Sequence, residues 1–527
     1  MSNYDEVKRN IMRNTISNYV RTFVGMFVGL ITFRLIYQSL TKEEFGFWSL
    51  LWSVFGYGVL LDFGFGFAAQ KRVAELSVKQ DWAQLSRVLS TIIFFYVGVA
   101  VIIGITVLAG SHTIISWFHV SSGNSTAFRH LLVVFFIGIG LAFPMGIIPE
   151  ILRGQQRIRL ANYIITCFLV LRLAFIWAAV HWHWGFMSIM LIALAFSLLP
   201  DLVALPLALK RMPEVRITPW LFSRSAVTET ATFSFFAYLT TATNIVLGKS
   251  DQLVLSATLG VTAIALYQAG SKVAEVFRDF SKQMQDTIAP AAAHLHASGD
   301  HQALRDLLVR TTRWAMIIAT PLYLLSAFYL TELLKLLTGD SVIGHETWLV
   351  GQILLFWYYA GIPTHSVIQR IYMMTGHERK LTRFGIAEAV LNLGLSIALV
   401  LIFKNVACVA IGTLVPTLYI GWVHLWPWLA RDLEMTRWQL IKKTILPVWI
   451  ACAPVFALLL ASLWIPHLRF ENSLVTVLTH GPVVGALAVF SLWCFVLSDS
   501  ERATLSRKIP LLRRHHQIAA LPDAEPI

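Results

Sequence analysis

Residues 88–110 read VLSTIIFFYVGVAVIIGITVLAG, a run without a single charged side chain. An α-helix of about 20 apolar residues is long enough to cross the hydrocarbon layer of a bilayer. Runs of this kind recur from one end of the chain to the other. A sheet edge facing lipid would leave its backbone groups without hydrogen-bond partners. The stretch therefore predicts an all-α polytopic membrane protein.

The composition of the whole chain supports this fold class. Its 527 residues are 57% hydrophobic and 13% charged, and the mean hydropathy is +0.66. A soluble globular chain is about 25% charged, so this one has too few charges to cover a surface in water. The 4 cysteines lie inside apolar runs without a CxxC pair. We therefore expect neither a disulfide framework nor a structural zinc site.

The apolar runs predict about 14 transmembrane helices. They are expected at residues 15–38, 45–68, 88–110, 128–150, 161–181, 186–208, 227–248, 253–277, 313–337, 348–370, 384–403, 405–428, 444–465 and 474–497.

The distribution of basic residues predicts the orientation. If the N-terminus is cytoplasmic, 33 of the 42 Lys and Arg residues fall in cytoplasmic segments and 6 in external ones. Such an excess is the usual sign of the cytoplasmic side. Both termini are therefore expected in the cytoplasm. The net charge of +13 then reflects topology and contact with anionic lipid, and gives no reason to expect nucleic acid.

Two halves of the chain resemble each other. DWAQLSRVLS at 81–90 recurs as DHQALRDLLV at 300–309, and RGQQR at 153–157 recurs as TGHER at 375–379. This parallel repeat predicts two pseudo-symmetric six-helix lobes, an organisation found in many secondary transporters. The expected divisions are an N-terminal lobe at 1–210, a C-terminal lobe at 211–430, two accessory helices at 431–500 and a cytoplasmic tail at 501–527.

The three remaining basic residues lie inside predicted helices. A charge at the centre of a membrane helix costs about 2.5–3.5 kcal/mol on insertion scales, so it normally faces a cavity or a partner. Arg172 is near the middle of its helix, whereas Arg21 and Arg34 are in the inner and outer parts of the first helix. The alternative for Arg21 and Arg34 is that they snorkel to the two surfaces. The alternative for Arg172 is an ion pair with a buried acid, for which Asp62 is the first candidate.

Other polar residues are secondary candidates. Asn18 and Asn244 lie on stripes of polar or small residues, and Lys272 lies where its helix is expected to leave the membrane. The simpler interpretation of Lys272 is an exposed helix end, and Lys249 and Asp251 are expected to form a solvated external corner. No Walker A, GxSxG or HExxH motif is present. We expect no catalytic residue, cofactor or metal.

Two stretches resemble a known family. Residues 40–76 (LTKEEFGFWSLLWSVFGYGVLLDFGFGFAAQKRVAEL) and 250–276 (SDQLVLSATLGVTAIALYQAGSKVAEV) resemble the hairpins that open the two lobes of Wzx-type polysaccharide flippases. The RGQQR turn also fits this family. The resemblance covers about residues 10–430, and its superfamily includes multidrug exporters and lipid II flippases.

The resemblance implies alternating access in the bacterial inner membrane, for surface polysaccharide assembly. The implied cargo is an undecaprenyl-pyrophosphate-linked oligosaccharide, held by cavity cations for which Arg21, Arg34 and Arg172 are suited. A guanidinium can bind pyrophosphate oxygens in a bidentate manner. The implied partners are membrane lipid, H⁺ or Na⁺, and other polysaccharide assembly proteins. Asp62 is a candidate for the coupling site as well as for an ion pair.

Three other functions compete with this one. A cation-coupled multidrug exporter of the same superfamily would favour a buried acidic cavity, whereas the deep charges here are mainly arginines. A membrane-embedded polysaccharide polymerase or ligase usually carries a large external loop, which this chain lacks. A structural scaffold gives no reason for Arg172. The sequence identifies neither the glycan nor the ion, and it leaves open whether Arg34 faces the cavity.

Overall fold

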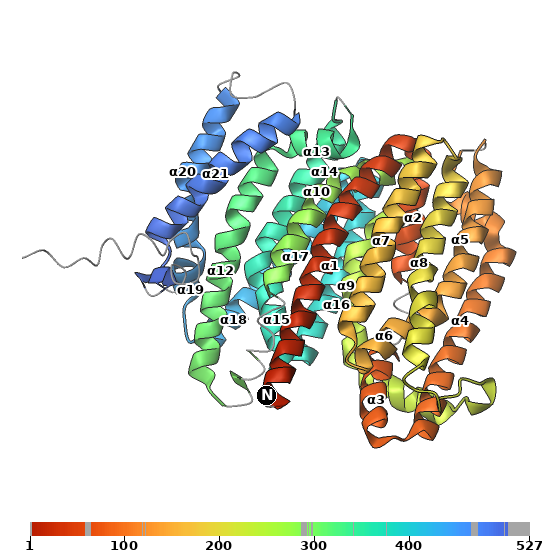
Figure 1. The fold of residues 1–527 in the computed structure, drawn as a ribbon. Coiled ribbons are helices and arrows are strands. Elements are labelled where there is room, and N and C mark those ends of the chain that lie inside the picture. Colours follow the sequence, from red (N-terminus) through yellow and green to blue (C-terminus); the bar gives the residue numbers. More distant parts are fainter. Residues whose placement is uncertain are drawn as a thin grey trace, which may run out of the picture. The chain divides into compact units, whose positions relative to one another are not determined.

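The structure is a computed structural model. It describes residues 3–57, 65–118, 120–121, 123–285, 292, 295–296, 299–340, 342–375, 377–464, 473–499 and 501–503. Every regular element in these residues is a helix (Figure 1). The all-α fold class predicted from the sequence is therefore confirmed.

The helices follow one another with short connections. The first half of the chain forms α1 (Asn3–Ser39), α2 (Lys42–Tyr57), α3 (Phe65–Lys79), α4 (Trp82–Trp117), α5 (Ser125–Met145), α6 (Ile147–Gly154), α7 (Ile158–His181), α8 (Gly185–Leu209), the 3₁₀ turn η2 (Pro219–Leu221) and α9 (Arg224–Thr258). The second half forms α10 (Val261–Gln285), α12 (His301–Phe328), α13 (Leu330–Thr338), α14 (His345–Gly361), the π-helical turn η3 (Ile362–Ser366), α15 (Val367–Met374), α16 (Glu378–Phe403), α17 (Ala407–Tyr419), the π-helical turn η4 (Ile420–Leu425), α18 (Trp426–Asp432), α19 (Arg437–Thr444), α20 (Leu446–Trp464) and α21 (Ser473–Phe495).

Many of these helices are suited to a bilayer. Among the described residues, 8 helices are long and apolar enough to span a membrane, or 10 if each of two bent pairs counts as one span. The pair α12–α13 bends by 72° and the pair α19–α20 by 47°. Each of the remaining predicted positions also holds a helix, but one that is shorter, interrupted or more polar. The chain is a multi-pass membrane protein.

One predicted boundary is wrong. The sequence placed a break and a solvated corner at residues 249–252, but α9 continues to Thr258 and the chain turns at Gly260, whose φ is +85°. Asp251 is only 5% exposed. In the sequence, the charged residues Lys249 and Asp251 are typical of a loop. In the structure, hydroxyl groups of other helices surround the Asp251 carboxylate, so the helix can continue through this position.

The chain forms two compact units. One consists of residues 1–276, 334–354 and 376–417, and the other of residues 277–333, 355–375 and 418–527. These units combine segments differently from the lobes that the repeat predicts. The division into lobes at 1–210 and 211–430 stays a prediction.

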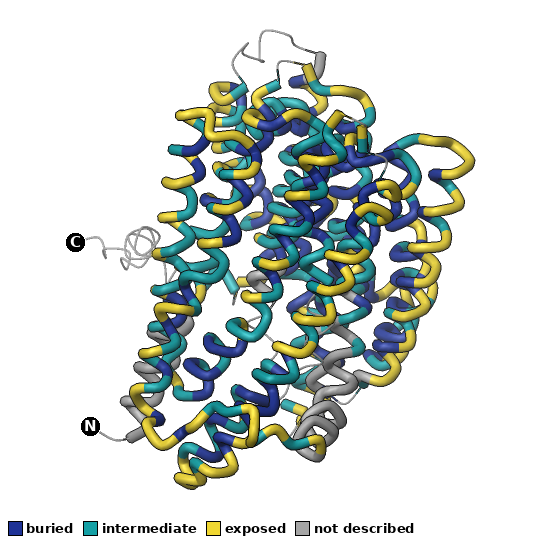
Figure 2. The backbone as a smooth tube through the Cα atoms, turned by 90° about the vertical axis from the view of Figure 1, so that its right-hand side faces the viewer, coloured by how far each residue is buried: buried dark blue, intermediate teal, exposed yellow. Residues whose placement is uncertain are grey.

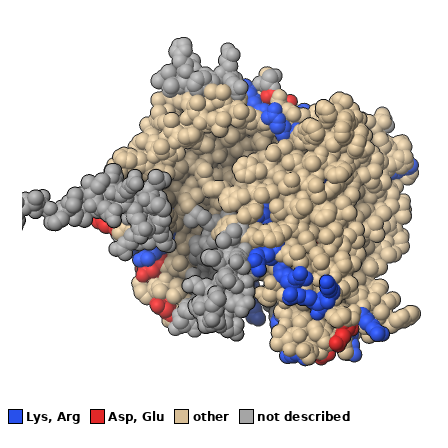
Figure 3. Space-filling model, in the orientation of Figure 1, with Lys and Arg blue, Asp and Glu red and all other residues tan. Residues whose placement is uncertain are grey.

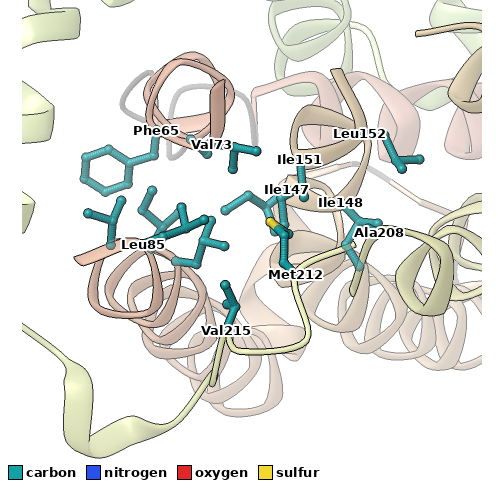
Figure 4. Close-up of a cluster of buried hydrophobic side chains, with 14 of the residues drawn as sticks. Phe65, Val73, Leu85, Ile147, Ile148, Ile151, Leu152, Ala208, Met212 and Val215 are labelled. Carbon is teal, nitrogen blue, oxygen red and sulfur yellow. The ribbon is translucent and has the colours of Figure 1, made fainter. Parts of the chain in front are cut away.

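The larger unit has a buried core around α3, α4 and α6 (Figure 4). Phe65, Leu85 and Ile151 come from these three helices, and Met212 comes from the segment after α8. A Cβ atom on Gly154 would lie 2.7 Å from the carbonyl oxygen of Gln70, so only glycine allows α6 to approach α3 this closely. In the unit of residues 277–333, 355–375 and 418–527, a smaller cluster joins α12 to α20 and α21. Most helices carry both buried and exposed residues (Figure 2).

The predicted repeat is visible in a local turn. Asp81 accepts a hydrogen bond from the backbone N–H of Gln84 at the start of α4, and Asp300 accepts one from Ala303 at the start of α12. The residue before each aspartate has a positive φ, 55° at Gln80 and 73° at Gly299. The same N-cap therefore begins the third helix of each predicted lobe.

Candidate functional site

The site is built on two adjacent helices, α1 and α7. The Asn162 side chain on α7 is 2% exposed and donates to Ser17 Oγ at 2.9 Å and to Asn18 Oδ1 at 2.6 Å. Further along, a Cβ on Gly25 would lie 3.8 Å from Leu169 Cδ2. The pairs Asn18–Asn162 and Gly25–Leu169 both differ by 144 in residue number. The two helices therefore run in the same direction with a fixed register.

This register sets the heights of the three arginines. Arg172 lies at the height of Val28, because 144 separates their numbers as well. With a rise of 1.5 Å per residue, Arg21 is roughly 10 Å to one side along the helix axis and Arg34 roughly 9 Å to the other. The sequence predicted three separate charges, and the structure arranges them as a series along one helix pair.

Arg172 points from the buried side of α7. Ala161, Ile165, Arg172, Ile176 and Ala179 recur at helical spacing on one stripe. Ala161 is 3% exposed, whereas Ile176 and Ala179 are fully buried. This stripe turns toward the α1 and α8 sides of α7, against which α7 packs. Arg172 therefore lies on the side of α7 that faces α1 and α8.

Arg21 lies on the side of α1 that faces α7. It lies one turn after Ser17 and one turn before Gly25, the two positions that contact α7. The Nε atoms of Arg21 and Arg172 are both buried and have no hydrogen-bond partner among the described residues. Arg153 of α6 is also near enough to Arg21 to repel its charge. Buried donors without acceptors are unfavourable, so these two guanidinium groups favour an anionic ligand.

Arg34 has a different environment. It is exposed and donates to the carbonyl oxygen of Leu336 in the last turn of α13. That carbonyl has no partner within its own helix, and a cation at a helix C-terminus is favourable. Nearby, Lys42 Nζ lies 3.3 Å from Asp340 Oδ2. These contacts join the end of α1 to the end of α13.

The sequence suggested that Lys272 lies at an exposed helix end, but the structure places it elsewhere. It is near the middle of α10, a helix of 25 residues, because α10 begins and ends later than predicted. Its Nζ lies 3.0 Å from Glu275 Oε2 and 5.6 Å from the ring centroid of Phe33 on α1. Lys272 therefore forms an ion pair with Glu275 on α10, beside the helix that carries Arg21 and Arg34.

Two predicted residues lie beyond what the structure describes. Asp62 is outside the described residues, and so is the side chain of Asn244. Their predicted roles stay predictions. Asn18 is exposed and accepts a hydrogen bond from Asn162, a residue that the sequence did not single out.

Two buried acids lie on other helices: the sequence placed Asp251 in a solvated corner and did not single out Glu388. Asp251 on α9 accepts a hydrogen bond from Tyr267 and lies 3.3 Å from Thr413 Oγ1 on α17. Asn392 on α16 donates to the same hydroxyl at 2.8 Å. One turn further along these helices, Glu388 is 3% exposed and accepts from the hydroxyl of Thr417. Carboxylate, hydroxyl and amide oxygens thus gather within the α9, α16 and α17 bundle.

A third acid lies on α8, which packs against the helix that carries Arg172. Asp201 on α8 lines a narrow pocket together with Pro149 of α6, Ile165 of α7 and Ala204 of α8. It makes no hydrogen bond or ion pair with any residue that the structure describes. The sequence feature that could have identified Asp201 is that it is a single acid within the apolar run 186–208.

The surface charge agrees with a membrane protein. Figure 3 shows that most of one face carries no charge and that basic side chains gather mainly toward its α3 end. The sequence predicts this end to be cytoplasmic.

Comparison with known proteins relates the chain to one family and one fold. A family model described as polysaccharide biosynthesis protein matches residues 11–280. No curated protein sequence matches the chain.

Solved structures resemble the whole fold. The lipid II flippase MurJ, in an inward closed conformation, is 14% identical over 91% of this chain and 98% of that chain, with a TM-score of 0.69. An inward-facing multidrug resistance MATE transporter of the MOP superfamily is 14% identical over 81% and 99%, with a TM-score of 0.61. A MOP superfamily transporter from Pyrococcus furiosus is 15% identical over 80% and 95%, with a TM-score of 0.57. This chain therefore has the fold of MOP-type transporters.

Proposed function

Because the chain belongs to the polysaccharide biosynthesis protein family, we propose that it flips a lipid-pyrophosphate-linked oligosaccharide across a membrane by alternating access. The membrane is the bacterial inner membrane, both termini are cytoplasmic, and the cargo moves from the cytoplasmic to the outer leaflet. The observation that carries this proposal is that the buried guanidinium Nε atoms of Arg21 and Arg172 have no hydrogen-bond partner in the described part of the chain.

The chemistry of these arginines suits a pyrophosphate. A guanidinium remains charged, presents a planar fork of donors and binds two oxygens at once, which a lysine ammonium does not. A pyrophosphate supplies several anionic oxygens. Arg21 and Arg172 lie roughly 10 Å apart along the helix axis, so the anion can be passed from one to the other as it crosses.

The multidrug exporter is the second candidate. A cationic drug would be repelled by Arg21 and Arg172, which lie on α1 and α7. The acids Asp251 and Glu388 lie instead on α9 and α16. The guanidinium groups on α1 and α7 therefore favour an anionic cargo over a cationic one.

Arg172 variants test the proposal in proteoliposomes. Arg172→Ala should lower the rate of flipping of a pyrophosphate-linked oligosaccharide by at least about tenfold, which corresponds to about 1.4 kcal/mol. Arg172→Lys should retain part of the rate, because the charge remains but the bidentate contact is lost. Arg159→Ala, at the start of the same helix, is the control and should keep the normal rate.

The rival interpretation of Arg172 is a structural ion pair with Asp62. It predicts that Arg172→Ala destabilises the protein and that adding Asp62→Asn restores both stability and flipping. Restoration by that double substitution would contradict a role in cargo binding.

Coupling to a cation is the second part of the proposed function. Asp251, Glu388 and Thr413 supply oxygens at buried positions, and oxygens are the ligands that hard cations require. A carboxylate at such a position can equally take up a proton. We infer that H⁺ or Na⁺ binds at Asp251.

Asp251→Asn should remove the dependence of flipping on the ion gradient. Flipping driven by an imposed gradient of pH or Na⁺ should fall to the rate without a gradient, while binding of the cargo stays within about twofold. Asp300→Asn is the matched control, since Asn also caps helices well. An undiminished response to both gradients in the Asp251→Asn variant would rule out this site.

A further inference from the structure

Asp201 is an acid near the middle of a membrane helix. It lies about four residues past the midpoint of α8, roughly 6 Å along the axis. A carboxylate at this depth is costly and usually has a partner or a function. None of the described residues forms a hydrogen bond or an ion pair with Asp201. Its pocket is lined by apolar side chains from α6, α7 and α8.

Asp201 and Arg172 lie at neighbouring heights on packed helices. The Phe196 ring on α8 lies 6.2 Å from Phe168 and 5.1 Å from Phe175 on α7, measured between centroids. Phe196 is therefore level with Arg172. Asp201 is five residues further along α8, or roughly 8 Å along the axis.

The directions of the two side chains bring them closer. A short turn joins α7 to α8, so the two helices are antiparallel. Side chains on a helix tilt toward its N-terminus. Arg172 therefore leans toward the height of Asp201, and Asp201 leans toward the height of Arg172. Both tilts shorten the separation of the two charges along the helix axis.

The other charged groups around α8 are already engaged or distant. From α6, Glu150 and Arg153 pair with each other. From α5, Arg129 and His130 lie near the start of the helix, at the opposite end from α6. The α7 helix carries Arg159 near its start, and Arg157, just before it, donates to the carbonyl oxygen of Leu207. Arg21 is closer in height to Asp201, but it lies on α1, which is not among the helices that pack most closely against α8. Among the charges on α5, α6 and α7, Arg172 is the nearest in height to Asp201 that has no ion pair with a described residue.

We propose that Asp201 competes with the anionic cargo for Arg172, and that its protonation state sets how tightly Arg172 holds an anion. This inference rests on the proposed function, because it requires Arg172 to bind the pyrophosphate. A transporter must release its cargo as well as bind it. The ionised carboxylate of Asp201 weakens the contact between Arg172 and the anion, and a protonated Asp201 strengthens it.

The experiment measures binding of farnesyl pyrophosphate to the full-length protein in detergent, with farnesol as the uncharged comparison. Asp201→Asn should bind farnesyl pyrophosphate about fivefold or more tightly than the unsubstituted protein, a typical size for coupling between two sites. The ratio of the two affinities should grow as the pH rises, because the probe's own titration cancels in it. Asp81→Asn, the same chemical change at an N-cap, should leave affinity unchanged.

The outcomes separate the inference from the proposed function. If Arg172→Ala binds farnesyl pyrophosphate as well as the unsubstituted protein does, Arg172 is not the anion site and the proposed function loses its basis. If Arg172→Ala weakens binding but Asp201→Asn leaves it unchanged or also weakens it, the competition is refuted and the anion site stands. Asp201→Ser provides the same test should the Asn variant not fold.

Discussion

At the scale of single residues, Asn162 fixes the position of the arginines. Its amide donates to Ser17 and Asn18 of α1, and so sets the register that places Arg172 level with Val28. Both hydrogen bonds join neighbouring membrane helices. Bonds of this kind contribute about 0.6 kcal/mol on average and up to about 2 kcal/mol each.

Replacing Asn162 tests this role. Asn162→Leu should lower the free energy of unfolding by about 1–3 kcal/mol, because it removes two bonds and leaves an acceptor on α1 unpaired. Ser188→Ala is the control, since the hydrogen bond of Ser188 goes to the carbonyl of Trp184, the N-cap of its own helix. Unfolding of the detergent-solubilised protein in a denaturant series gives both values. Equal losses for the two variants would mean that Asn162 does not hold the helix pair.

Some site residues could be predicted from the sequence and others could not. Arg172 could be identified because a guanidinium deep in an apolar run is costly unless it has a partner or a function. The sequence analysis placed Asp251 in a solvated corner because two charged residues so close together, Lys249 and Asp251, are typical of a loop. The end of a helix can be predicted from sequence only to within several residues. Asp201 was missed because its importance depends on α6 and α7, which are neighbours only in the folded chain.

At the scale of elements, hydropathy predicts where helices lie but not where they bend. All the predicted apolar runs contain helices, yet α12–α13 bends by 72°. Two π-helical turns could not be predicted from the sequence, because such a turn leaves the hydrophobic pattern almost unchanged. They are η3, between α14 and α15, and η4, between α17 and α18. The close approach of α6 to α3 depends on Gly154, whose partner is known only from the structure.

The start of α2 gives an element-level prediction. Glu43 accepts hydrogen bonds from Ser121 N–H at 2.7 Å, from Ser121 Oγ at 2.9 Å and from Asn124 Nδ2 at 2.6 Å. Partial burial acts to raise the pKa of Glu43, but these bonds outweigh it and hold the pKa below its ordinary value. The contact ties α2 to the connection between α4 and α5.

A carboxylate with a lowered pKa stabilises the fold above its unfolded pKa, and this contribution disappears as pH falls through the folded pKa. Glu43→Gln should therefore be less stable than the unsubstituted protein near neutral pH, and the difference should shrink as the pH falls below about 4. Asp499→Asn is the control, because that side chain is fully exposed. A stability difference that is the same at all pH values would contradict the account of Glu43.

At the scale of the whole molecule, the sequence repeat matches the order of the helices better than it matches the two compact units. The N-caps Asp81 and Asp300 begin corresponding helices with the same backbone turn. The compact units nevertheless group α9, α16 and α17 with the first 210 residues. Sequence similarity records the ancestry of each half, whereas contacts depend on which helices touch in one conformation. The orientation in the membrane rests on the distribution of Lys and Arg.

The most direct test of the central claim compares two cargoes in proteoliposomes containing the purified protein. One is an undecaprenyl-pyrophosphate-linked oligosaccharide, detected by a lectin or glycosidase that reaches only the outer surface, and the other is a cationic dye. We predict protein-dependent flipping of the glycolipid, with at least about tenfold less in the Arg172→Ala variant, and no transport of the dye. Transport of the dye without flipping of the glycolipid would contradict the account and identify the chain as a drug exporter.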